Sequence, residues 1–135
     1  MLEEEAKFYM SILKEVTDAD GTKRYVTIPA YSPEHGPYTA GNVYENVLVW
    51  QLFNDCIEAA EALNANKAGT VSDEQIAEWT KYRDGLKPIE IGESGQIKEW
   101  YDETALGQTA NGKISGYDPK HRHMSHLLGV YPGDW

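Results

Sequence analysis

Apolar residues recur at three- and four-residue steps over residues 2–16, and this spacing predicts an amphipathic helix. Three consecutive glutamates fall in its first turn, where the helix dipole favours negative charge. The following run, residues 23–31, is rich in β-branched and aromatic side chains until Pro29 interrupts it. We expect an extended segment there, as one strand of a short β-hairpin.

The longest helical pattern covers residues 42–63. Its apolar side chains lie on one half of the circumference, but Asn42, Glu45 and Asn46 project onto that same half at the beginning of the helix. Such an arrangement is typical of a helix whose N-terminus points into a pocket. It also fits Asn42 as the N-cap residue with Glu45 as its capping-box partner. The two roles are compatible.

A further helix is predicted over residues 73–84, because Ser72 and Gln75 have the capping-box spacing. Together with the preceding helix it forms an αα-hairpin. Residues 104–120 are predicted to be a long exposed loop, and a short helix is expected to begin near Met124. The pattern therefore predicts an all-α fold with long loops and one short β-hairpin.

One helical hairpin and a flanking helix do not enclose a convincing hydrophobic core. The apolar faces of these helices need partners, so we expect residues 1–135 to be a single fragment of a larger helical domain. Apolar faces left uncovered also predict that the isolated chain self-associates or is poorly stable.

Composition narrows the function. A net charge of −10 weighs against nucleic acid, which requires a surplus of Lys and Arg. The sequence shows no apolar run that could span a membrane and no signal-peptide pattern at its start. Cys56 is the single cysteine, so an internal disulfide is excluded. With no Gly-rich phosphate loop either, we predict no cofactor. Four Trp, nine Tyr and two Phe beside many carboxylates suit sugar binding, although they also suit an ordinary core.

The Pro- and Gly-rich loop at residues 31–42 contains the first candidate for chemistry. Glu34 lies between Pro33 and His35 in a turn rich in aromatic rings. Shielding from water there would keep a carboxylic acid protonated, as a general acid requires. The alternative is an ordinary solvated glutamate in a loop.

A second candidate is the cluster of acids around Trp100. Glu99 precedes this ring directly, and Glu93, Asp102 and Glu103 lie nearby in the sequence. Carboxylates beside aromatic rings are typical of a glycosidase cleft, where two acids flank a sugar. They fit a charged helix face equally well.

Three of the four histidines lie together, at positions 121, 123 and 126. A metal-dependent hydrolase using His121, His123 and His126 is one hypothesis. Arg122 disfavours a nearby cation, however, and an Arg with a His is well suited to hold hydroxyls or a carboxylate. We therefore predict that no metal binds here.

Three blocks, taken in order, resemble the helical catalytic domain of glycoside hydrolase family 95, the α-L-fucosidases. They are SPEHGPYTAGNVYENVLVWQLFNDCIEAA, LKPIEIGESGQIKEW and HRHMSHLLGVYPG. The third block is the most diagnostic. The resemblance implies an (α/α)6 barrel, of which this chain would form about a third. It also implies a fucosylated oligosaccharide or glycan as the partner, and an extracellular or periplasmic location for the parent family.

The resemblance further implies inverting hydrolysis of terminal α-1,2-linked L-fucose, or of L-galactose in some relatives. Glu34 would be the general acid, whereas Arg122 and His123 would bind the sugar. Glu99, Trp100 and His35 would complete the cleft. His35 directly follows Glu34 in the sequence, and Trp100 directly follows Glu99.

The family activates its water through asparagine side chains polarised by an aspartate, and neither motif occurs among these residues. The isolated chain is therefore expected to be inactive. The alternative to a glycosidase fragment is a non-catalytic helical module that binds a glycan or another protein.

Overall fold

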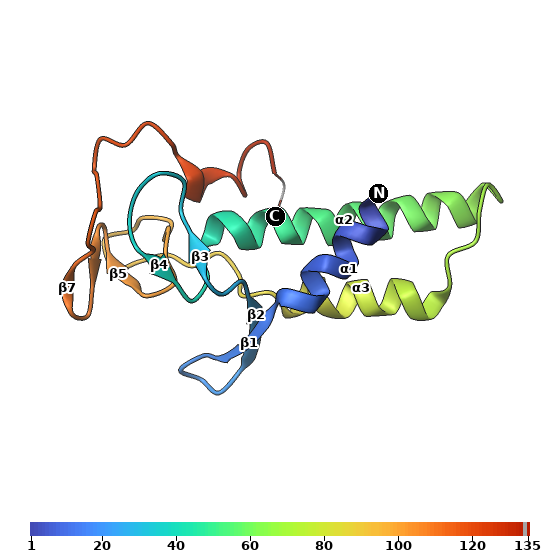
Figure 1. Cartoon of the computed structure of the whole chain (residues 1–135), viewed down its shortest axis with the longest axis horizontal. Coiled ribbons are helices and arrows are strands. Elements are labelled where there is room, and N and C mark those ends of the chain that lie inside the picture. Colours follow the sequence, from blue (N-terminus) through green and yellow to red (C-terminus); the bar gives the residue numbers. More distant parts are fainter. Residues whose placement is uncertain (134) are drawn as a thin grey trace.

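The computed structural model describes residues 1–133 and 135. Helices α1 (Leu2–Ile12), α2 (Val43–Ala65) and α3 (Asp73–Gly85) are joined by short strands and loops. The α2 and α3 helices lie side by side as the predicted hairpin, and α1 packs against α2 (Figure 1). The loops and most of the strands gather at the end of the molecule where α2 begins. No helix in the described part of the chain is long and apolar enough to cross a membrane.

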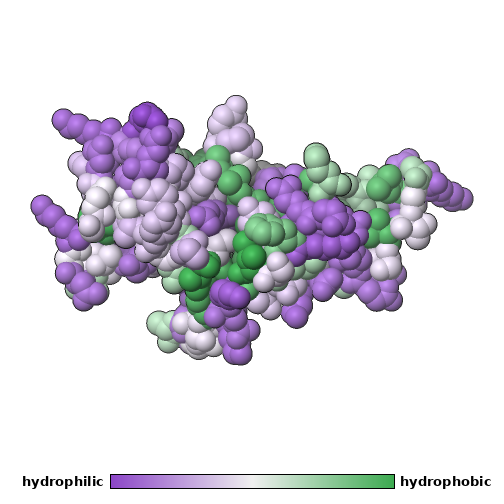
Figure 2. All heavy atoms as spheres, in the orientation of Figure 1, coloured by the Kyte–Doolittle hydropathy of each residue, from purple (hydrophilic) through white to green (hydrophobic). Residues whose placement is uncertain are grey.

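The hydrophobic core lies between the three helices. Phe53 on α2 is fully buried, and Trp79 on α3 and Ala6 on α1 face the same cluster. Hydrophobic side chains are nevertheless exposed along the helical part, whereas hydrophilic ones dominate the loop end (Figure 2). Leu48 and Leu63, both on α2, are examples of such exposed residues.

Both predicted helix starts are confirmed. The Asn42 side chain is the N-cap of α2 and accepts a hydrogen bond of 2.7 Å from the Glu45 amide. The Ser72 side chain accepts one of 3.2 Å from the Gln75 amide at the start of α3. These bonds satisfy amides that have no partner within the helix.

The first predicted helix is too long. It ends at Ile12, and β1 (Lys14–Thr17) pairs antiparallel with β2 (Lys23–Val26), with Lys14 opposite Val26. Leu13 turns the backbone into an extended conformation and is itself buried. The β-branched Val16 and Thr17 fit a strand better than a helix end. The predicted hairpin therefore exists, and its first strand was assigned to the helix.

The predicted all-α fold with one short β-hairpin is confirmed only in part, because further small sheets accompany the helices. In addition to β1 and β2, β3 (Ala30–Tyr31) pairs with β4 (Tyr38–Thr39). The expected loop at 104–120 contains most of a three-stranded antiparallel sheet formed by β5 (Glu103–Ala105), β6 (Gln108–Thr109) and β7 (Gly112–Lys113).

This sheet was missed because its strands are only two or three residues long and carry no periodic apolar pattern. Ile114 after β7 is buried, so this segment is not fully exposed. Near Met124 the structure has a single 3-10 turn, η1 (Ser125–Leu127), in place of an α-helix. The molecule is thus a mixture of helices and small sheets.

Candidate functional site

Three loops meet at the N-terminus of α2. The first covers residues 31–42, the second contains Glu99, and the third contains Gly116. The Val43 amide donates a hydrogen bond of 3.1 Å to the Glu99 carbonyl, which joins the start of the helix to the second loop. The Gly36 amide donates one of 3.2 Å to the Gly116 carbonyl, which joins the first loop to the third. Residues far apart in the sequence are therefore held together at this end of the molecule.

Glu34 stands at the tip of a tight turn. Its backbone has φ of 66°, a left-handed conformation that is uncommon for a residue other than glycine. Gly36, with φ of 77°, packs so closely on the Trp100 ring that any side chain would overlap it. The Glu34 side chain is 50% exposed, so the expected shielding from water is not present in this structure.

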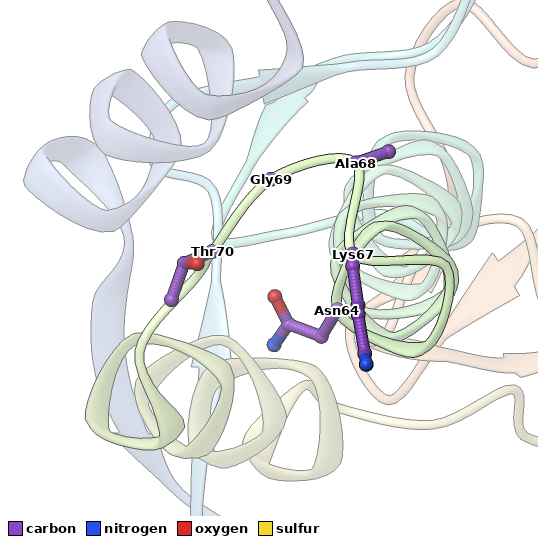
Figure 3. A pocket seen from close by; sticks show the side chains of 5 residues that line it. All are labelled: Asn64, Lys67, Ala68, Gly69 and Thr70. Carbon is purple, nitrogen blue, oxygen red and sulfur yellow. The ribbon is translucent and has the colours of Figure 1, made fainter.

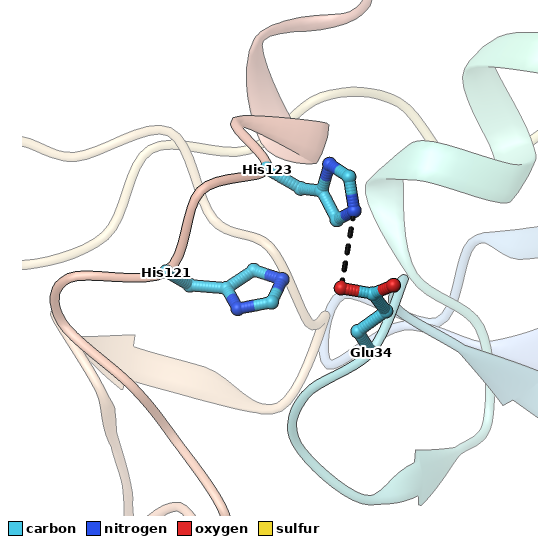
Figure 4. Close-up of side chains that lie close together, drawn as sticks. All are labelled: Glu34, His121 and His123. Carbon is cyan, nitrogen blue, oxygen red and sulfur yellow. Dashed lines mark ion pairs between the residues drawn. The ribbon is translucent and has the colours of Figure 1, made fainter.

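Arg122 and His123 both reach Glu34. The Arg122 Nη2 atom lies 2.6 Å from Glu34 Oε1. On the other side, His123 Nε2 lies 3.3 Å from Glu34 Oε2 (Figure 4). These side chains come from a segment about 88 residues further along the chain. The structure thus brings together the carboxylate and the two candidate sugar-binding residues of the sequence analysis.

Glu99 lies beneath this exposed group and is buried. Its Oε1 atom accepts hydrogen bonds from the Ser32 hydroxyl and from His35 Nε2, the latter at 3.0 Å. The other ring nitrogen of His35 accepts a bond of 3.5 Å from the Asp118 amide, so Nε2 carries the proton. His126 Nδ1 lies 3.7 Å from the second carboxylate oxygen. Glu99 therefore fixes the loops around it.

Aromatic rings connect the buried layer to the surface. His35 packs edge-on against Trp100 at 5.1 Å between centroids and stacks on His121 at 4.1 Å. His121 Nε2 donates a hydrogen bond of 3.0 Å to the Pro33 carbonyl, directly before Glu34. In this structure His35 and Trp100 are buried supports of the acid loop, and Glu34, Arg122 and His123 form its accessible face.

Sequence reasoning missed two supporting residues. Glu103 is almost fully buried and accepts hydrogen bonds from the Glu99 amide at 2.9 Å and the Gly107 amide at 2.8 Å. Ser32 is fully buried on Glu99. Glu103 belonged to the recognised cluster of acids, but its burial cannot be inferred from that cluster alone. Ser32 carried no signal beyond its place next to Pro33.

Two hollows on the surface of the molecule could each contact a ligand. One, of about 320 Å³, lies directly beside the acid loop and is lined by Pro33, Tyr44, His123, Met124, Ser125 and Leu128. Another, of about 390 Å³, lies at the α2–α3 linker, remote from Glu34 (Figure 3). The Asn64 side chain there bonds the Val71 backbone amide and carbonyl, at 2.8 and 2.9 Å. That asparagine stabilises the linker, whereas the first hollow adjoins candidate chemistry.

The histidines are not arranged as the metal hypothesis required. His126 faces Glu99 and does not join His121 and His123. Instead Glu34 joins those two, with one potential ligand atom from each residue and all three atoms within 4.8 Å of one another.

Comparison with known proteins identifies the family of this chain. The glycosyl hydrolase family 95 catalytic domain matches residues 1–135. The chain is 34% identical over 112 residues to "Probable alpha-fucosidase A" of Aspergillus oryzae, covering 83% of this chain and 14% of that protein. It is 32% identical over 133 residues to the protein of the same name from Aspergillus niger, covering 95% of this chain and 15% of the relative.

A plant protein, "Alpha-L-fucosidase 2" of Arabidopsis thaliana, is 29% identical over 119 residues, which are 79% of this chain and 12% of the relative. The chain thus spans about a seventh of the length of the fungal relatives it matches. The family match extends over every residue from the first helix to the histidine-rich segment. This chain belongs to the glycosyl hydrolase family 95 catalytic domain.

Proposed function

We propose that this segment forms the acid-bearing side of the sugar site in an α-L-fucosidase of family 95. The substrate would be a fucosylated oligosaccharide or glycan. The observation that carries the proposal is the meeting of Glu34 with Arg122 and His123 on an accessible surface. Glycoside cleavage uses a carboxyl group that protonates the glycosidic oxygen, and Arg122 and His123 can donate hydrogen bonds to hydroxyl groups of the sugar.

In the proposed reaction Glu34 donates its proton to the glycosidic oxygen as the bond from that oxygen to the anomeric carbon breaks. The leaving alcohol keeps the proton and the electron pair of the broken bond. A water molecule attacks the anomeric carbon from the opposite face and loses a proton to a base, so the configuration inverts. We assign no residue of this chain to that base, and we expect the chain alone not to hydrolyse fucosides.

Arg122 would change its partner when the substrate binds. In this structure its guanidinium group bonds to the carboxylate oxygen atoms of Glu34, although the Arg122 side chain is 70% exposed. A sugar that offers hydroxyl groups to Arg122 would draw it away and leave Glu34 facing the glycosidic oxygen. His123, at the other carboxylate oxygen, would bind a second hydroxyl group.

Glu99, His35 and Trp100 would position the acid loop. All three are buried and bond or pack against one another or against the loops. We place them beneath the sugar site as supports of Glu34. The side chains of the α2–α3 hairpin would belong to the wall of an (α/α)6 barrel, which supplies the partners that its exposed apolar residues lack here.

Sugar binding tests the proposal without any need for turnover. Calorimetric titration of the 135-residue chain with L-fucose and 2′-fucosyllactose should detect weak binding, and Arg122→Ala should reduce the affinity by about tenfold. Lys120→Ala, a matched loss of a cation two positions away, should leave the affinity unchanged. Absence of binding, or equal loss in both variants, would contradict the proposed sugar site.

The same titration separates the proposal from a non-catalytic binding module. Hydrolysis of 2′-fucosyllactose by the isolated chain would show that the base is present after all. Binding of an unrelated glycan with equal affinity would instead favour a general glycan-binding module.

A further inference from the structure

In contrast to the expectation from the sequence that no metal binds at the histidines, we propose that Glu34, His121 and His123 form a binding site for a first-row transition-metal cation of the Zn²⁺ class. The potential ligand atoms of the three residues already lie within 4.8 Å of one another (Figure 4). The inference concerns cation binding and stands whether or not Glu34 is a catalytic acid.

The spacing of the side chains suits shared coordination. Two ligand atoms that each lie about 2.1 Å from a tetrahedral zinc ion are about 3.4 Å apart. His123 Nε2 and Glu34 Oε2 are 3.3 Å apart, so this edge of a coordination shell already exists. His121 approaches Glu34 from another side than His123 (Figure 4). Its ring stacks on His35. Small movements of exposed side chains would complete the shell.

The chemistry of the donors selects the kind of cation. Two imidazoles and one carboxylate are the ligands of many zinc sites that keep a position open for water, whereas Ca²⁺ and Mg²⁺ prefer oxygen alone. His121 Nε2 now donates its proton to the Pro33 carbonyl. Coordination through this nitrogen would break that hydrogen bond, and the proton would move to Nδ1 so that the ring remains a neutral ligand.

Arg122 is the competitor of the cation. Its guanidinium group lies 2.6 Å from Glu34 and repels a second positive charge there. The side chain is 70% exposed and can swing into solvent at little steric cost. Binding of the cation and pairing of Arg122 with Glu34 therefore exclude each other, and removal of Arg122 should strengthen metal binding.

Equilibrium dialysis of the 135-residue chain against ZnCl2, with elemental analysis, tests the site. We expect about one zinc ion per chain, with affinity lowered at least about tenfold by His121→Ala or His123→Ala. Arg122→Gln should raise the affinity severalfold. His126→Ala is the matched control, because His126 lies outside the cluster, and it should leave the affinity unchanged.

A second measurement needs no variant and so does not depend on their folding. In NMR spectra of the unsubstituted chain, one equivalent of ZnCl2 should shift the ring signals of His121 and His123 and leave those of His126 in place. Substoichiometric binding, an effect of His126→Ala equal to that of His123→Ala, or weaker binding after Arg122→Gln would overturn the proposal.

Discussion

The helical part and the loop end of this molecule are stabilised by different interactions. In the cluster between the three helices the buried side chains are apolar, and Phe53 on α2 is fully buried among them. At the loop end the buried side chains include His35, Glu99 and Glu103, each joined to its neighbours by hydrogen bonds. Apolar burial is non-directional, whereas buried hydrogen bonds fix the positions of the atoms that make them.

This difference shows that one part of the chain provides most of its hydrophobic stabilisation, whereas another part positions the candidate chemical groups. The helices need only hydrophobic side chains of suitable volume, so many sequences could form them. The loops have few apolar residues to bury, and a polar network orders them. That network positions Glu34 at the surface. Its neighbour Pro33 is bonded by His121, and Gly36 packs on the Trp100 ring.

The largest effect on stability should come from the helical part. Phe53→Ala removes a fully buried ring and should lower the free energy of unfolding by about 3–5 kcal/mol, measured by urea denaturation. Leu48→Ala, on the same helix but 44% exposed, is the control and should cost less than about 1 kcal/mol. Equal losses in the two variants would show that α2 is not organised around this core.

A smaller and more local effect should come from the loop end. Glu99→Gln removes one charged acceptor from the bonds of Ser32 and His35 and should cost about 1–3 kcal/mol. Hydrogen exchange should accelerate at the Gly36 and Asp118 amides and stay unchanged in the middle of α2. The exposed Glu93→Gln is the matched control. Acceleration spread evenly over the helices would break the distinction between the two regions.

The smallest effect on stability should arise at the junction between the helical part and the loop end. There Lys87 bonds Asp18 and lies 2.8 Å from Glu90. Burial raises the pKa of Glu90, but hydrogen bonds from Lys87 and Lys98 outweigh it and hold this pKa below its ordinary value. A carboxyl group of this kind stabilises the fold above its unfolded pKa, and the contribution is lost as pH falls through the folded pKa.

Glu90→Gln should therefore cost about 1–2 kcal/mol at neutral pH and little in acid. Thermal unfolding between pH 7 and pH 3 would measure this: the difference between the variant and the original chain should shrink on acidification. A difference that stays constant across this range would contradict the role of the ionised carboxylate.

The sequence was a good guide where periodicity and capping determine the structure. The α2–α3 hairpin and its caps at Asn42 and Ser72 followed from apolar spacing and from short polar side chains placed before each helix. The end of α1 was misplaced because Val16 continues the helical spacing while tertiary pairing with β2 requires a strand. Local pattern could not reveal that competition.

The candidate site was predicted in part, through resemblance more than through physical pattern. Motifs indicated Glu34, Arg122 and His123, and the structure brings these three together. Their meeting depends on contacts between segments about 88 residues apart, which no local pattern specifies. The burial of Glu99 and its bond to Ser32 likewise emerge only when the loops are folded.

Turnover by a Glu34→Gln variant tests the central claim most directly. It would be measured in a chimera of the Aspergillus oryzae relative whose matching segment is replaced by this chain, with the unsubstituted chimera as reference. We predict that kcat on 2′-fucosyllactose falls by about 10²–10⁴-fold while KM stays nearly unchanged, and that an aryl fucoside with a good leaving group loses much less. A kcat close to that of the reference on both substrates would contradict the assignment of Glu34 as the acid and leave Glu99 as the next candidate.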